Sequence, residues 1–235
     1  EIGSGLVGSE MCIRDRTYEA VEAIDNDDPV LLQEELGDVL LQVVFHAQIE
    51  AEAGRFTMDD VADGICKKMI YRHPHVFGSV EVKNSDEVLT NWDALKQKEK
   101  HQKSTTETLE SVARSLPGLI RAEKVQHKAA KVGFDWDEVS GALDKVREET
   151  AEVARAINGD GDPSEELGDL LFAVVNVARF LKTDPEDAIN RTTDKFIRRF
   201  AQVEQAAKDA GRSLSEMSLA EMDALWDAAK QKEHE

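Results

Sequence analysis

The sequence predicts an all-α fold built from two copies of one helical domain. Three observations favour this fold class: a helix-forming composition, an acidic phrase that occurs twice, and apolar residues at helical spacing. Ala, Leu, Glu, Lys and Asp dominate the 235 residues, and only 5 prolines interrupt the chain. Residues 34–40 read Glu-Glu-Leu-Gly-Asp-Val-Leu, and residues 165–171 read Glu-Glu-Leu-Gly-Asp-Leu-Leu. No strand is strongly indicated, and residues 76–83, which alternate weakly, are expected to form a loop.

The two acidic phrases belong to a longer internal repeat. Three further pairs of segments correspond in the same order: Thr17-x-Glu19 with Thr150-x-Glu152, Asp28-Pro29 with Asp162-Pro163, and residues 92–99 with residues 226–233. The last pair reads Trp-Asp-Ala-Leu-Lys-Gln-Lys-Glu in the first copy and Trp-Asp-Ala-Ala-Lys-Gln-Lys-Glu in the second. Agreement at both ends and in the middle predicts a duplicated domain.

Each acidic phrase runs into an apolar helical stripe. Apolar residues recur at spacings of three and four in both copies: Leu36, Val39, Leu40, Val43, Val44 and Ala47, and then Leu167, Leu170, Leu171, Val174, Val175, Ala178 and Leu181. We expect each helix to begin at its Asp-Pro pair, with Asp as the cap and Pro in the first turn. A preceding helix holds Val146 to Ile157 and ends at Asn158-Gly159. The short turn at 159–163 predicts that these two helices pack antiparallel.

The domain boundaries follow from the repeat and from local composition. Residues 1–16 show no helical period and resemble translated sequencing-adapter sequence, so we expect them not to belong to the natural protein. Lys, Ser and Thr cluster within residues 100–117, which indicates a boundary before the second copy. We therefore expect a first helical domain at 17–103 and a second at 104–235.

The charge and the cysteines narrow the possible partners and location. The formal net charge of −19 opposes binding of a nucleic-acid polymer, whose phosphates would be repelled, but it permits a single nucleotide. No stretch approaches the roughly 18 continuous apolar residues of a membrane span, so no membrane insertion is expected. Cys12 and Cys66 lack the spacing of a redox or metal motif, which favours a reducing, cytoplasmic location without a disulfide.

Carboxylates of the second copy are spaced to meet between two helices. Glu149 and Glu152 share one helix face with Glu148 beside them, and Glu166 and Asp169 are three apart on the next helix. Pairing of the helices brings the two sets together, where their charges repel and raise each other's pKa. A hard divalent cation removes that conflict, so the cluster predicts a Mg²⁺ or Mn²⁺ site. The alternative is that these acidic residues only favour helix starts and exposed surfaces.

A di-iron carboxylate bundle is a rival metal site. Such a site requires Glu-x-x-His on two helices. None of the six histidines stands three residues after a glutamate, which argues against this class. His73 and His75 flank Pro74, so they are expected in a loop, and their case as metal ligands is weak.

Basic and aromatic residues of the second copy are candidates for holding a polyphosphate and a base. Lys195 and Arg199 are four apart on one predicted helix face. Opposite a metal ion, such a pair can bind phosphates, with the arginine supplying paired donors. Trp226, one turn before Lys230, can stack on a base. The alternatives are an ordinary exposed pair of basic residues and core packing of the tryptophan.

The second copy carries Glu-Glu-x-x-Glu at 148–152 and Glu-x-x-Asp at 166–169. Three longer motifs accompany them: Glu-Glu-Leu-Gly-Asp-Val-Leu-Leu-Gln-Val-Val-Phe-His-Ala at 34–47, Arg-His-Pro-His-Val-Phe-Gly at 72–78, and Lys-Ala-Ala-Lys-Val-Gly-Phe-Asp-Trp at 128–136. With these motifs the chain resembles the two-domain bacterial form of the MazG nucleoside triphosphate pyrophosphohydrolases, over about residues 17–235. The resemblance implies all-α domains with four-helix-bundle-type cores that are completed by dimerisation, and hence a homodimer.

The resemblance also implies an activity and a set of site residues. The activity is Mg²⁺-dependent hydrolysis of nucleoside triphosphates to monophosphate and pyrophosphate, by water attack at the α-phosphorus. The implied metal ligands are Glu149, Glu152, Glu166 and Asp169. The implied substrate-binding residues are Lys145, Glu148, Asp162, Pro163, Ser164, Glu165, Lys195, Arg199, Trp226 and Lys230. Glu148 and Glu149 are both candidates for the catalytic general base, because the sequence does not separate a ligand from a base.

The first copy departs from the family pattern at its start. Asp15-Arg16 stand where paired glutamates are expected, and Arg16 brings a positive charge to the place of a metal ligand. We therefore assign catalysis to the second copy. One interpretation of the first-copy counterparts is a vestigial site with these members: Glu19, Glu35, Asp38, Lys68, Arg72, Trp92 and Lys96. The alternatives are that the first copy supports folding or dimerisation, or that it has its own site in an intact protein.

Two other functions are compatible with the sequence. One is a non-catalytic helical module that binds a nucleotide or serves as a dimeric scaffold. The other is a related all-α pyrophosphatase restricted to dUTP or a modified nucleotide. The intact acidic set of the second copy argues against the non-catalytic module, whereas only a panel of substrates separates the two enzymes.

Overall fold

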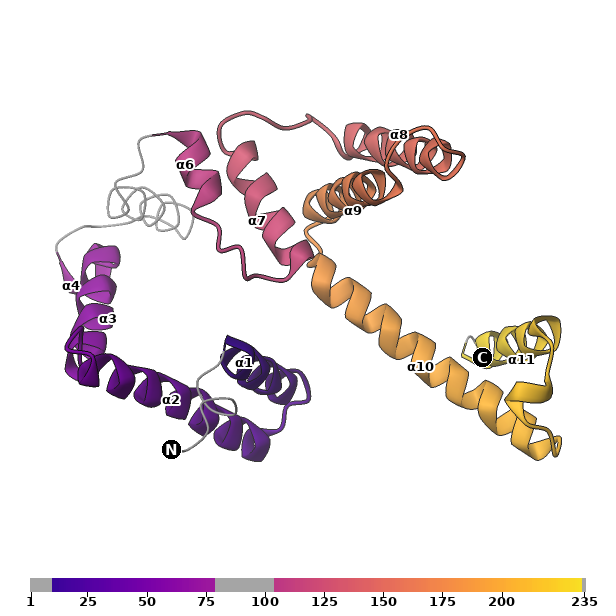
Figure 1. Ribbon diagram of the computed structural model, residues 1–235, viewed down its shortest axis with the longest axis horizontal. Coiled ribbons are helices and arrows are strands. Elements are labelled where there is room, and N and C mark those ends of the chain that lie inside the picture. Colours follow the sequence, from indigo (N-terminus) through magenta and orange to yellow (C-terminus); the bar gives the residue numbers. More distant parts are fainter. Residues whose placement is uncertain (1–9, 79–103, 234–235) are drawn as a thin grey trace. The chain divides into compact units, whose positions relative to one another are not determined.

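The computed structural model describes residues 10–78 and 104–233, and every regular element in these two ranges is a helix (Figure 1). The prediction of an all-α fold is therefore confirmed. The chain divides into two compact units, a first unit at Glu1–His101 and a second unit at Gln102–Glu235. No helix in the described ranges has the length and apolar character that a membrane crossing requires.

Within residues 10–78, the part of the first unit that the structure describes, a long helix pair is followed by two further helices. Its elements are α1 (Glu10–Asp25), α2 (Pro29–Glu52), α3 (Met58–Arg72) and α4 (Pro74–Phe77). Helix α1 packs along α2, and α3 contacts α2 through the turn that joins them. In this helix pair, the residues of α1 before Thr17 lie against the first acidic phrase, which is on α2.

The start of α1 lies in the segment 1–16, whose sequence shows no helical period. Helix α1 nevertheless begins at Glu10 and includes residues 10–16. Local contacts stabilise this turn, because the Thr17 hydroxyl donates to the carbonyl of Ile13 and Arg16 pairs with Glu19 one turn ahead. The spacing of apolar residues carries no information on such polar contacts, so it did not indicate this part of the helix.

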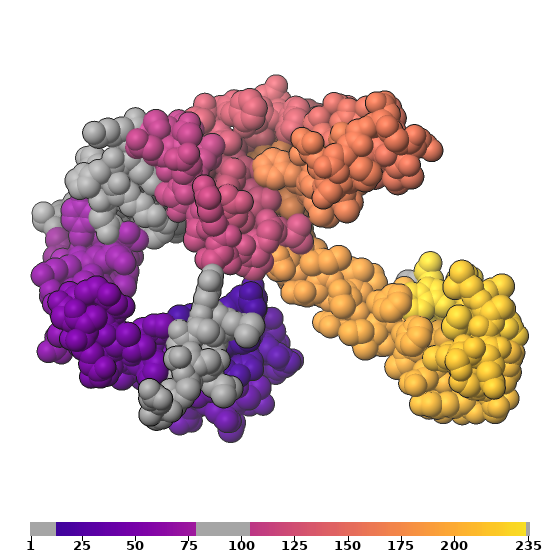
Figure 2. Space-filling view, viewed as in Figure 1, coloured from indigo at the N-terminus to yellow at the C-terminus, as the bar shows by residue number. Residues whose placement is uncertain are grey.

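The second unit contains three main helix pairs, two of which share α9. Its elements are α6 (Thr105–Glu110), α7 (Gly118–Ala130), α8 (Val139–Ile157), α9 (Pro163–Phe180), α10 (Pro185–Asp209), the 3₁₀ turn η1 (Leu214–Glu216) and α11 (Leu219–Lys232). Helix α9 packs against α8 on one side and α7 on the other, while α11 folds back along α10. In Figure 2 the far end of α10 and α11 form a lobe that is separate from the α8–α9 part, whereas α10 also contacts α7 and α9.

Asp-Pro pairs start the helices as the sequence predicts. The Asp28 carboxylate accepts hydrogen bonds from the backbone N–H groups of Val30 and Leu31 at the start of α2. Asp162 accepts from the backbone N–H of Ser164 at the start of α9. In both helices the proline occupies the first turn, where it costs no backbone hydrogen bond.

The turn between α8 and α9 is short and rich in glycine. Helix α8 ends at Ile157 with Asn158 as its cap, which confirms the predicted helix end. Gly159 and Gly161 have φ angles of +96° and +119°, a backbone region that residues with a side chain rarely adopt. These two glycines let the chain reverse within a few residues, so that α8 and α9 pack side by side.

Small residues lie between the paired helices. The buried apolar residues on these helices are mostly alanines and valines: Ala20, Ala23, Ala47, Ala142, Ala156, Ala173, Val175, Val203, Ala207 and Ala229. Larger members of the predicted stripes stay about half exposed, including Leu36 at 54% and Leu167 at 50%. The described helices of either unit therefore form pairs that leave much of the stripe uncovered, and they do not complete the expected four-helix core.

A partly buried ion pair ties the segment after α7 to α9. The Arg179 guanidinium donates to both oxygens of Asp135 at 2.5 and 2.9 Å, and it also donates to the Asn176 side chain. The two charged side chains are only 13% and 24% exposed. The paired hydrogen bonds of Arg179 hold the pKa of Asp135 below its ordinary value.

Substitution Asp135→Ala is expected to lower the free energy of unfolding by about 1.5–3 kcal/mol, because it removes charge-assisted hydrogen bonds and leaves Arg179 unpaired. Thermal or urea unfolding at pH 7 measures the change. Asp144→Ala, in an exposed pair with Arg147, is the matched control and should change stability by about 0.5 kcal/mol or less. Since the pKa of Asp135 is lowered by folding, the difference between wild type and Asp135→Ala must shrink as the pH falls below 4. A difference that persists unchanged at acid pH contradicts this assignment.

Candidate functional site

The two helices of the α8–α9 pair bring five acidic side chains together. Carboxylate oxygens of Glu148, Glu149 and Glu152 lie within 4.8 Å of one another, and so do those of Glu149, Glu166 and Asp169. Glu149 belongs to both groups, so it links the acidic face of α8 to that of α9. We call these five residues the second acidic cluster. The structure thus places side by side the residues that the sequence spacing expected to converge.

Glu149 is the buried centre of this cluster. It is 4% exposed, and its Oε2 atom is buried without a hydrogen-bond partner. The Lys145 ammonium lies 2.5 Å from its other oxygen and 2.9 Å from Glu148. These two hydrogen bonds raise the pKa of Lys145, which therefore stays charged. One oxygen of the buried carboxylate remains open for a positively charged ligand.

The pKa of Glu166 is raised by its surroundings. Burial raises its pKa, and the carboxylates of Glu152, Glu149 and Asp169 raise it further. Glu152 is paired with Arg155 at 2.8 Å on its own helix, which leaves the side facing α9 acidic. A hard cation with oxygen ligands suits this arrangement, because it removes the repulsion and completes the coordination of the buried oxygen.

The turn residues fix the start of α9 and with it the position of Glu166. Asp162 caps the helix, Pro163 stands in its first turn, and Ser164 donates its backbone N–H to Asp162. Glu165 is exposed in the same turn. At Gly161 an added Cβ would lie 3.4 Å from Glu166 Oε1, so the glycine leaves room for that carboxylate. Four consecutive candidate residues, 162–165, therefore border the second acidic cluster.

The candidate residues of α10 and α11 form a separate group. Arg199 donates to Glu233 at 2.7 Å, and its guanidinium lies 5.8 Å from the Trp226 ring. Trp226 also packs on Phe196, with ring centroids 4.9 Å apart. Lys195 and Lys230 are exposed. Figure 1 shows α11 beside the far half of α10, away from α8 and α9. The sequence analysis expected this group to lie opposite the acidic residues, and within the unit it does not.

The first unit has its own cluster, with a guanidinium inside it. Glu19 from α1 and Glu35 and Asp38 from α2 gather around Arg16, at 2.7, 3.7 and 3.2 Å respectively. The other two described candidates of the first copy lie on α3, where Lys68 is exposed and Arg72 is the last residue of the helix. Trp92 and Lys96 lie outside the described residues.

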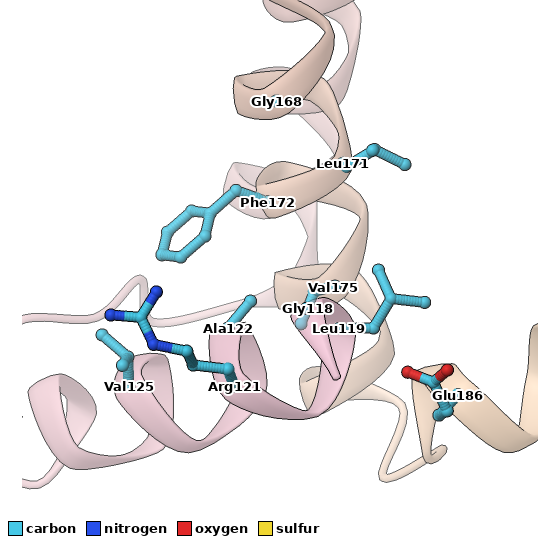
Figure 3. Close-up of a pocket in the computed structure, with 10 residues that line it drawn as sticks. All are labelled: Gly118, Leu119, Arg121, Ala122, Val125, Gly168, Leu171, Phe172, Val175 and Glu186. Carbon is cyan, nitrogen blue, oxygen red and sulfur yellow. The ribbon is translucent and has the colours of Figure 1, made fainter. Parts of the chain in front are cut away.

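The sequence analysis missed an apolar cavity between α7 and α9. Its volume is about 450 Å³, and Leu119 and Ala122 of α7 face Phe172 and Val175 of α9 across it (Figure 3). Arg121 stands at its edge. The spacing of Leu119, Ala122 and Val125 by threes is the signal that would have indicated a second helix on this face of α9.

A domain model and the similar known proteins all indicate the same family. A model of the MazG nucleotide pyrophosphohydrolase domain matches twice, at residues 11–77 and 138–204. A nucleoside triphosphate pyrophosphohydrolase of Escherichia coli K12 is 42% identical over 223 residues, which is 93% of this chain and 85% of the relative. A nucleoside triphosphate pyrophosphohydrolase/pyrophosphatase MazG of Thermotoga maritima is 41% identical over 91% of this chain and 81% of its own length. The uncharacterized protein YabN of Bacillus subtilis is 50% identical over 92% of this chain, which corresponds to 45% of its length.

The two matches of the domain model confirm the internal duplication that the acidic phrases predict. Both matches contain one cluster of carboxylates, on α1 and α2 in the first unit and on α8 and α9 in the second. The chain belongs to the MazG nucleotide pyrophosphohydrolase family and carries two copies of its domain.

Proposed function

We propose that this chain hydrolyses nucleoside triphosphates to nucleoside monophosphates and pyrophosphate at the second acidic cluster. The observation that supports this most is the meeting of Glu149, Glu166 and Asp169 around a buried carboxylate oxygen without a hydrogen-bond partner. The activity for which the relatives from Escherichia coli and Thermotoga maritima are named agrees with it. A triphosphate is itself negatively charged, so such a site accepts it only with cations between the two.

The donor set suits Mg²⁺, with Mn²⁺ as a substitute, because every candidate ligand is a carboxylate oxygen. Glu149, Glu152, Glu166 and Asp169 are the residues that would hold the ion. When bound, such an ion neutralises phosphate oxygens and lowers the pKa of a coordinated water. The chain's own contribution is to fix the carboxylates from two paired helices, so that little rearrangement is needed when the ion enters.

Exposure separates the two candidates for the general base. Glu149 is buried and belongs to both carboxylate groups, which suits a ligand. Glu148 stands at the exposed edge beside Lys145, and its access to water suits a residue that takes a proton from the water attacking the α-phosphorus. We therefore assign Glu148 as the base and Glu149 as a ligand. The Lys145 ammonium lies beside Glu148, so it could release this carboxylate and bind a phosphate oxygen of the substrate instead.

The remaining substrate-binding residues lie on α10 and α11. Lys195 and Arg199 would bind phosphates and stabilise the departing pyrophosphate, while Trp226 and Lys230 would contact the nucleoside. Within one chain this group lies away from the second acidic cluster. We propose a homodimer in which helices of a second copy cover the half-exposed stripe of α9 and bring the two groups together. Exposed Leu171 and Phe172 on α9, and Phe196 and Ile197 on α10, support such an interface.

Product analysis tests the reaction. Purified chain is incubated with Mg²⁺ and each canonical or damaged nucleoside triphosphate, and the products are resolved by ion exchange. We expect nucleoside monophosphate and pyrophosphate. Nucleoside diphosphate with orthophosphate contradicts attack at the α-phosphorus. Turnover of dUTP or one modified nucleotide alone favours the restricted pyrophosphatase, and binding without any product favours the non-catalytic module.

Removal of single carboxylates tests the site. Glu152→Ala and Asp169→Ala should each lower kcat/KM by at least about a hundredfold, which corresponds to about 3 kcal/mol of lost transition-state stabilisation. Asp144→Ala removes an exposed acidic residue of α8 that is outside the cluster and should leave turnover unchanged. Near-normal rates in either cluster variant remove that residue from the proposed site.

The electrostatic conflict in the cluster predicts opposite effects with and without metal. Folding raises the pKa of Glu166, so its charged form destabilises the metal-free protein at neutral pH. Glu166→Gln should therefore raise Tm in the presence of a chelator, and it should reduce the rise in Tm that Mg²⁺ produces by binding the folded state. Asp144→Asn, at an exposed carboxylate of α8 outside the cluster, is the matched control. A fall in Tm for Glu166→Gln in chelator contradicts the proposed repulsion.

A further inference from the structure

Arg199 on α10 is held by a carboxylate from the end of α11. Its Nε atom donates to Glu233 Oε2 at 2.7 Å, and its Nη2 atom lies 2.6 Å from the same oxygen. The two side chains are only 13% and 26% exposed. The guanidinium also lies 5.8 Å from the centre of the Trp226 ring. An anion and an aromatic ring therefore fix the position of Arg199 together.

The arrangement leaves one part of the guanidinium for a ligand. Both contacts with Glu233 use Nε and Nη2, and among the described residues no other carboxylate pairs with Arg199. The Nη1 atom keeps its N–H donors, which suit an oxygen of a phosphate group. Lys195, one turn earlier on α10, is exposed and supplies a second positive charge on the same helix face.

The order of Arg199 before a ligand arrives affects how tightly it binds. A free arginine side chain loses rotamer freedom when it binds a phosphate, and an arginine that is already held loses less. The Glu233 carboxylate has an opposing effect, because its charge repels a triphosphate. That repulsion acts through solvent and is screened over about 8 Å at physiological ionic strength, whereas the contacts with Arg199 are direct. We therefore expect the ordering effect to be the larger one.

A second ion pair ties α11 to the residues after α10 and does not involve Arg199. Arg212 donates from Nη1 to Glu221 at 2.5 Å and from Nη2 to the carbonyl of Glu216 at 2.9 Å. The hydrogen bonds from Arg212 and Ser218 lower the pKa of Glu221 to about 2. The return of α11 along α10 therefore does not depend on Glu233 alone.

The internal repeat keeps the residues of the Arg199 contact. Arg199, Trp226 and Glu233 correspond to three residues of the first copy: Arg72, Trp92 and Glu99. The last two of these lie outside the described residues. Phe196, which also packs on Trp226, corresponds to Met69. The arginine, the ring and the carboxylate thus recur as a set, whereas the neighbouring aromatic packing does not.

We propose that Glu233 is a positioning residue, which holds Arg199 against Trp226 so that the guanidinium is ready to bind the pyrophosphate part of a nucleoside triphosphate. Glu233 acts through Arg199 and does not touch the reacting atoms. The class of ligand rests on the proposed function, whereas the contact itself is a property of the α10–α11 pair. Glu233 thus adds a residue to the candidate site that the motifs of the sequence did not indicate.

Binding of a non-hydrolysable nucleoside triphosphate with Mg²⁺ to the full chain tests this inference, with isothermal titration calorimetry as the readout. Glu233→Ala should raise Kd by about tenfold, because Arg199 then has to be ordered by the ligand. Glu233→Gln keeps an oxygen that accepts from Arg199, so its Kd should stay within about threefold of the wild type. Glu221→Ala is the matched control: it breaks the other ion pair of α11 and should lower Tm without changing Kd.

A double-mutant cycle shows whether Glu233 acts through Arg199. In the Arg199→Ala background, removal of Glu233 should no longer weaken binding. The inference is overturned if Glu233→Ala binds the analogue as tightly as the wild type or more tightly, or if its loss of affinity persists without Arg199. It is also overturned if Glu221→Ala weakens binding equally, since Glu233 then only holds the two helices together.

Failure of the proposed function gives a different result. In that case the wild type binds the analogue but forms no nucleoside monophosphate and pyrophosphate from the natural triphosphate, and the binding cycle still decides the role of Glu233. A wild type that does not bind the analogue overturns both.

Discussion

A buried carboxylate between two paired helices requires a positive charge, and both units of this protein are built around that requirement. In the second unit the carboxylate is Glu149, with one oxygen held by Lys145 and the other without a hydrogen-bond partner. In the first unit it is Glu35, which faces the guanidinium of Arg16. Burial of an unpaired charge is costly, so each buried carboxylate lies beside a positive group. In the second unit that group is the Lys145 ammonium, and one carboxylate oxygen stays without a hydrogen-bond partner.

The helix pairs make this arrangement possible through short, well-capped connections. Asp162 and Pro163 start α9 immediately after a glycine-rich turn, so Glu166 and Asp169 face the acidic side of α8 within one turn of the helix start. Alanines between the helices allow close packing, which shortens the distance between carboxylates on neighbouring backbones. The uncovered half of the apolar stripe and the place of α11 away from α8 and α9 are the two observations behind the proposed homodimer.

Local rules in the sequence were sufficient for the helices and for the acidic cluster of α8 and α9. Asp-Pro pairs, apolar spacing and the repeat act over a few residues, and the structure follows them at Asp28, Asp162 and Asn158. The start of α1 was missed because polar contacts of Arg16 stabilise it. The place of Arg199 and Trp226 depends on how α10 leaves α9, which no local pattern records. The cavity between α7 and α9 likewise depends on tertiary packing.

Anomalous diffraction from crystals grown with Mn²⁺ and a non-hydrolysable nucleoside triphosphate tests the central claim most directly. In the proposed function the metal lies in the second acidic cluster. The account predicts an anomalous peak among Glu149, Glu166 and Asp169, with the triphosphate bound to it, and no peak beside Arg16. A peak among Glu19, Glu35 and Asp38, or a nucleotide bound away from the second acidic cluster, would contradict it.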